Sequence, residues 1–137
     1  MKFLRLYKII SLTFSITFII VGFIFLSIPD KVLVFFNTLS DYLGMAPMPV
    51  IGFDFYVVLA VAYMYLVALL AFWMYRHPEN RFFPLLLANG KFASSLISFY
   101  AFFAHQPYLI FAVNGLVDGL IGLTVMIFYR KMKKRIP

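Results

Sequence analysis

The sequence predicts an all-α membrane protein: an antiparallel four-helix transmembrane bundle with a short amphipathic interfacial helix between the first two spanning helices. The chain of 137 residues is 64% hydrophobic and 12% charged, against about 45–50% and about 25% in soluble domains. Four stretches of at least 21 residues carry one charge or none, and about 20 apolar residues are enough to cross a bilayer. The length suits a single transmembrane domain over residues 1–137.

The first spanning helix is expected over about residues 9–29, a stretch without charge that follows Lys2, Arg5 and Lys8. A basic start and an apolar run are also typical of a signal peptide. However, the apolar part of a signal peptide is only about 7–15 residues long. We therefore expect a helix that is retained in the mature protein.

A short amphipathic helix is expected over about residues 31–43. Apolar side chains recur there at the i, i+3, i+4, i+7 and i+11 positions of a helix, namely Val32, Phe35, Phe36, Leu39 and Leu43. Such a helix can lie in the membrane interface or fold over the end of the bundle, and the sequence leaves both open. The proline-containing residues 45–49 predict an irregular linker.

Three more spanning helices are expected, over about residues 55–75, 82–104 and 108–129. A polar turn with Pro78 separates the first two, and the three residues 105–107 separate the last two. Because that second connection is so short, the last two helices should form an antiparallel hairpin.

The basic residues predict the orientation. Ten of the twelve Lys and Arg residues fall in the N-terminal tail, the turn at 76–81 and the C-terminal tail: Lys2, Arg5, Lys8, Arg76, Arg81, Arg130, Lys131, Lys133, Lys134 and Arg135. Basic segments stay on the cytoplasmic side, so both termini should be cytoplasmic. Beside spanning helices, these charges favour anionic lipid headgroups as partners and argue against nucleic acid.

Lys91 and Asp118 are the only charges in the last two spanning stretches. A Lys or Asp in the middle of a spanning helix costs about 2.5–3.5 kcal/mol on insertion scales, so each needs a reason to be there. Their depths along the expected hairpin differ by less than the reach of a lysine, which makes an ion pair feasible. Alternatively, Lys91 reaches the interface and Asp118 bonds to Ser94, Ser98 or water.

Other polar residues share the helix faces of these two charges. Lys91, Ser94, Ser95 and Ser98 occur at i, i+3, i+4 and i+7, and Asn114 lies one turn before Asp118. The set is consistent with a polar clasp between helices, with a path for a proton, ion or substrate, or with contact to a charge on another subunit.

Small residues mark positions of close helix packing. Gly115, Gly119 and Gly122 allow two backbones to approach in lipid, either inside the monomer or at a dimer interface. Further expected packing positions are Ala60, Ala68 and Ala71 in the second span, and Thr13, Thr17 and Gly22 in the first.

No catalytic or cofactor-binding set is visible. The chain has no cysteine, no phosphate-binding loop, no metal-ligand spacing and no Ser-His-Asp arrangement, so we expect no cofactor. The leading hypothesis is a non-enzymatic structural or accessory subunit of a homo- or hetero-oligomeric membrane complex. The alternative is a small transporter or proton-linked carrier that uses Lys91 and Asp118. A third is a lipid- or quinone-handling enzyme with a site near Asp54, Tyr100 and His105.

Overall fold

The computed structural model describes residues 2–133 and contains five α-helices in this range. They are α1 (Lys2–Ser27), α2 (Pro29–Tyr42), α3 (Phe55–Arg76), α4 (Phe82–Ala104) and α5 (Leu109–Lys133). All except α2 are long and apolar enough to cross a membrane. The predicted all-α bundle of four spanning helices is therefore confirmed. Lys134 and Arg135, counted in the orientation argument, lie outside the described residues.

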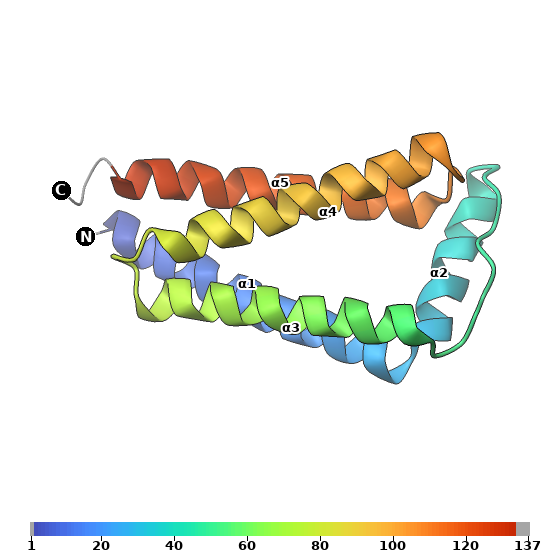
Figure 1. Cartoon of the computed structure of the whole chain (residues 1–137), viewed down its shortest axis with the longest axis horizontal. Coiled ribbons are helices and arrows are strands. Elements are labelled where there is room, and N and C mark those ends of the chain that lie inside the picture. Colours follow the sequence, from blue (N-terminus) through green and yellow to red (C-terminus); the bar gives the residue numbers. More distant parts are fainter. Residues whose placement is uncertain (1, 134–137) are drawn as a thin grey trace.

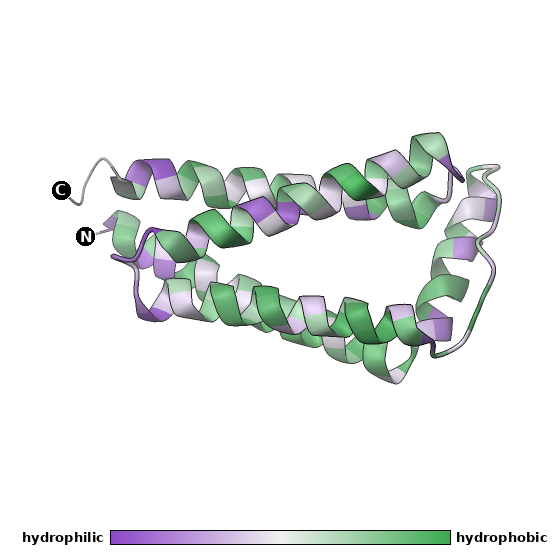
Figure 2. Ribbon diagram, in the orientation of Figure 1, coloured by the Kyte–Doolittle hydropathy of each residue, from purple (hydrophilic) through white to green (hydrophobic). Residues whose placement is uncertain are grey.

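The spanning helices form two antiparallel pairs, α1 with α3 and α4 with α5 (Figure 1). The pairs converge at the end where α1 begins and α5 ends, and they diverge toward the other end, which α2 crosses. The contact between the pairs runs mainly through α3 and α4. The last two helices form the predicted hairpin. Figure 2 shows hydrophilic stretches at the convergent end and another halfway along α4.

Two helices extend beyond the stretches expected to span the bilayer. α1 begins at Lys2 rather than residue 9, and α5 continues to Lys133 rather than ending at residue 129. The sequence prediction placed these two boundaries beside the nearest basic residues, Lys8 and Arg130. However, Lys and Arg are good helix formers and no Gly or Pro interrupts either extension, so the helices continue past these charges. At the other end of α1, Pro29 begins α2, as suits a residue that lacks a backbone N–H.

The α1–α3 interface uses small and hydroxylated residues of α1. The Ser15 hydroxyl donates to the carbonyl of Ala68 at 2.9 Å, which joins the two helices. A Cβ at Gly22 would lie 3.0 Å from the Cβ of Met64, so this glycine allows close approach. Thr13, expected here, is instead exposed and its hydroxyl donates to Ile9 of its own helix. Ser11 and Ser15 are buried in its place, because the face toward α3 lies about 200° from Thr13 at 100° per residue.

α2 lies across the divergent end and contacts both α1 and α5. Val32 and Phe36 are half-buried, whereas Phe35 and Leu39 are exposed, so the expected apolar face is divided between the bundle and the outside. The helix folds over the end of the bundle, and its exposed apolar side chains also suit the expected place in the membrane interface. The side chain of Asn37 holds the linker there, since it accepts from the N–H of Met48 and donates to its carbonyl, both at 2.8 Å.

Candidate functional site

Lys91 and Asp118 form a buried ion pair between α4 and α5. The distance from Lys91 Nζ to Asp118 Oδ1 is 2.8 Å, and the two residues are 2% and 4% exposed. The Lys91 ammonium also lies 4.5 Å from the ring centroid of Phe18 on α1 and 5.2 Å from that of Tyr63 on α3, within the range of cation–π attraction. The four spanning helices thus each contribute one side chain to this point.

The remaining predicted polar residues extend the contact between α4 and α5. The Ser95 hydroxyl donates to the carbonyl of Gly115 at 2.6 Å. The Asn114 amide donates to the hydroxyl of Ser98 at 2.7 Å and to that of Ser94 at 3.3 Å. The six predicted residues therefore lie in one interface, and Lys91 bonds to Asp118 rather than extending to the membrane surface. Among the described side chains of residues 2–132, no buried nitrogen or oxygen lacks a hydrogen-bond partner.

The three glycines of α5 allow this interface to form. A Cβ at Gly115 would lie 3.1 Å from the ring of Phe99, one at Gly119 would lie 3.0 Å from the Ser95 hydroxyl, and one at Gly122 would lie 2.9 Å from the ring of Phe92. All three neighbours belong to α4. The structure thus uses these glycines inside the monomer.

A cavity of about 290 Å³, here called the polar cavity, adjoins the ion pair. Its polar lining comes mainly from α4 and α5, with Lys91, Ser94, Asn114 and Asp118, and Thr17 of α1 and Tyr63 of α3 add two hydroxyl groups. Its apolar wall comes mainly from α1 and α3 and includes Phe18, Phe25 and Ala60. The ion pair therefore borders open space between the two helix pairs, where the structure has room for a further group.

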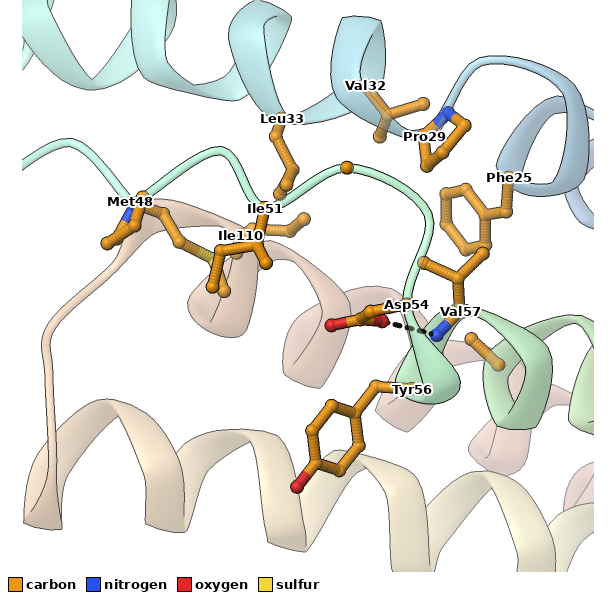
Figure 3. A pocket seen from close by; sticks show the side chains of 13 residues that line it. Phe25, Pro29, Val32, Leu33, Met48, Ile51, Asp54, Tyr56, Val57 and Ile110 are labelled. Atoms are coloured by element: carbon orange, nitrogen blue, oxygen red, sulfur yellow. Dashed lines mark hydrogen bonds between the residues drawn. The ribbon is translucent and has the colours of Figure 1, made fainter.

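A second space of about 460 Å³, here called the α2 pocket, lies under α2 and the linker (Figure 3). Its lining is almost entirely apolar and comes from α1, α2, the linker, α3 and α5: Phe25, Pro29, Val32, Leu33, Met48, Pro49, Ile51, Gly52, Asp54, Tyr56, Val57, Ala60 and Ile110. Its one carboxylate, Asp54, accepts from the Val57 N–H at 3.0 Å and so caps α3.

The two spaces adjoin each other, because Phe25 and Ala60 line both. An apolar compartment at the divergent end therefore lies next to a polar one in the middle of the bundle. Neither Phe18 nor the α2 pocket was predicted from the sequence. The regular spacing of Ser11, Ser15, Phe18 and Gly22 marks the inward face of α1 and was the available signal for Phe18.

The residues named for the enzyme hypothesis are not gathered around one space. The rings of Tyr100 and His105 lie 5.3 Å apart, but neither residue lines the α2 pocket that Asp54 lines. Among residues 2–133, no group of three or more His, Asp or Glu side chains is arranged to hold a metal ion.

Comparison with known proteins adds no assignment, since no protein-family model, curated protein or solved structure matches the chain.

Proposed function

We propose that this small multi-pass membrane protein is a carrier that binds an amphiphilic molecule between its two helix pairs. The observation that supports this function is the position of the Lys91–Asp118 pair, which is buried among packed side chains and also lines the polar cavity. A clasp that only fixes helices needs no adjoining space, whereas ligand sites are typically apolar cavities with a few placed polar groups. Ionisable residues inside a membrane commonly mark substrate or ion paths.

The chemistry of the two spaces suggests the kind of ligand. Lys91 and Asp118 together carry no net charge, so a charged ligand group would lack a counter-ion in the polar cavity. A neutral hydroxyl or carbonyl can exchange hydrogen bonds with the ammonium, the carboxylate or Asn114. The α2 pocket accommodates an apolar chain. A neutral polar group on a hydrocarbon chain therefore fits the two compartments together.

Filling the junction of the two spaces should prevent binding. We expect Ala60→Phe to reduce ligand occupancy severalfold, because Ala60 lines both spaces. The matched control is Ala62→Phe, which adds the same side chain to an exposed position of α3. The measurement is photo-crosslinking of a long-chain alcohol that carries a diazirine in its chain, with labelled peptides identified by mass spectrometry. Equal labelling of both variants and the wild type around residues 48–60 would contradict the proposed site.

A role as an accessory subunit, or self-association, remains a second proposal. The observation in its favour is Asn89, which is exposed on α4 and donates to the carbonyl of Leu85 at 2.9 Å. Amide side chains in spanning helices can also bond to neighbouring helices. Native mass spectrometry of gently solubilised protein tests this proposal, and a strictly monomeric species without partners would contradict it.

We also propose that both termini are cytoplasmic. The support is that the basic segments at the start of α1, the α3–α4 turn and the end of α5 lie at one end of the bundle, while Asp30, Asp41 and Asp54 lie at the other end. A cysteine placed at position 78 should resist a membrane-impermeant maleimide in intact cells and react after permeabilisation. Labelling of that cysteine before permeabilisation would reverse the assignment.

A further inference from the structure

A third space, here called the basic groove, lies at the convergent end of the molecule. It measures about 460 Å³ and lies between α1 and α3, away from the ion pair and the α2 pocket. Its lining combines cationic, aromatic and aliphatic side chains: Leu4, Arg5, Lys8, Ile9, Leu12 and Tyr75.

The groove is polar at the end of the bundle and apolar deeper along α1. Arg5 and Lys8 are three residues apart, and Ile9 and Leu12 continue the same helix face at i+4 and i+7 from Arg5. At 1.5 Å per residue, Leu12 lies about 10 Å further along the helix than Arg5. If α1 spans the membrane, the two cations of the groove lie near the membrane surface and Ile9 and Leu12 lie toward the hydrocarbon region.

The two cations are available to an anion. Among the described side chains of residues 2–132, neither Arg5 nor Lys8 forms an ion pair with a carboxylate. Lys8 Nζ lies 6.0 Å from the ring centroid of Tyr75, which keeps the ammonium beside the groove. No acidic residue lines the groove, so an incoming phosphate meets only attractive charge.

We propose that the basic groove binds one anionic phospholipid from the adjacent leaflet. The phosphate group contacts Arg5 and Lys8, and an acyl chain lies along Ile9 and Leu12. Arg suits phosphate because its planar guanidinium can donate two parallel hydrogen bonds. A zwitterionic lipid has the same phosphate but adds a cation to a site that already holds two. The groove should therefore prefer phosphatidylglycerol to phosphatidylcholine.

Native mass spectrometry of the detergent-solubilised full chain, titrated with dioleoyl phosphatidylglycerol or dioleoyl phosphatidylcholine, tests this proposal. The wild type should bind the anionic lipid more tightly, and Arg5→Gln/Lys8→Gln should weaken that binding by about thirtyfold, given the attraction of each cation near the surface. The matched control Lys2→Gln/Arg130→Gln removes the same charge from exposed positions outside the groove and should retain tight binding. Equal losses in both double variants, or no preference between the lipids, would overturn the site.

A second variant tests the apolar half of the groove. Leu12→Trp leaves both cations in place and fills the space proposed for the acyl chain, so it should also weaken phosphatidylglycerol binding. Binding equal to the wild type would mean that the lipid is held by charge alone, and it would overturn the proposed groove. Thermal unfolding of each variant without added lipid shows whether its fold is intact. Because the groove does not adjoin the polar cavity, these results do not depend on the proposed carrier function.

Discussion

Replacing Lys91 by Met, or Asp118 by Leu, is expected to lower the free energy of unfolding by about 3–5 kcal/mol. Each substitution leaves one charge at 2–4% exposure without its partner at 2.8 Å. The aromatic rings of Phe18 and Tyr63 cannot replace the carboxylate as a counter-ion for Lys91. The Ser95 hydroxyl is already bonded to the Gly115 carbonyl, and the Ser98 hydroxyl to the Asn114 amide. Either single mutant should therefore unfold well below the wild-type temperature.

The double mutant Lys91→Met/Asp118→Leu should recover most of this loss. Replacing both members of a buried ion pair with apolar residues of similar size is often neutral or stabilising, because two desolvation penalties disappear together. Thermal unfolding of the wild type, both single mutants and the double mutant in the same detergent measures the coupling. Losses that simply add in the double mutant would show that the two side chains do not interact.

A methyl group at Gly122 is expected to destabilise the fold by about 1–3 kcal/mol, the usual cost of overpacking. The new Cβ would lie 2.9 Å from the Phe92 ring, so α4 and α5 must separate or the ring must move. The matched control is Gly90→Ala on α4, where the nearest atom to the new Cβ is the Tyr63 hydroxyl at 3.9 Å. That substitution should be neutral or stabilising, because Ala is the better helix former by about 1 kcal/mol.

The measurement is again thermal unfolding, with Gly122→Ala/Phe92→Leu as a rescue variant. The smaller, flexible leucine should make room for the added methyl group and restore part of the lost stability. If Gly122→Ala and Gly90→Ala unfold at the same temperature, the close contact between α4 and α5 at Gly122 does not exist.

The spanning helices were predictable because each requires a long run without charge, and the chain has four such runs. The contact between Lys91 and Asp118 could be predicted from the sequence for a related reason. A lone charge in an apolar helix needs a partner, and the short turn at residues 105–107 brings the two residues to similar depths. Here the local pattern and the tertiary structure agree, because lipid leaves a buried charge few alternatives.

The two adjoining spaces were not predictable in the same way. They depend on the angle between the helix pairs, and helical periodicity does not specify that angle. The sequence also predicts the inward face of α1 incorrectly at Thr13, which is exposed, whereas Ser11 is buried. Both residues are small and polar, and only the rotation of α1 relative to α3 determines which of them is buried. The spacing of Ser11, Ser15, Phe18 and Gly22 indicates that Phe18 faces inward, but nothing in the sequence distinguishes this phenylalanine, one among 18, as the one that lies against a cation.

Binding of the diazirine alcohol to the folded Lys91→Met/Asp118→Leu variant tests most directly whether the ion pair serves a ligand. A matched hydrocarbon probe without the hydroxyl group is the control. In the wild type, we expect the alcohol to label residues that line the polar cavity more strongly than the hydrocarbon does. In the double mutant that preference should fall severalfold while the fold is retained, because the ammonium and the carboxylate are gone and only neutral groups such as Asn114 remain to bond the hydroxyl. An unchanged preference for the alcohol in the double mutant would contradict the carrier function and leave the pair as a clasp between α4 and α5.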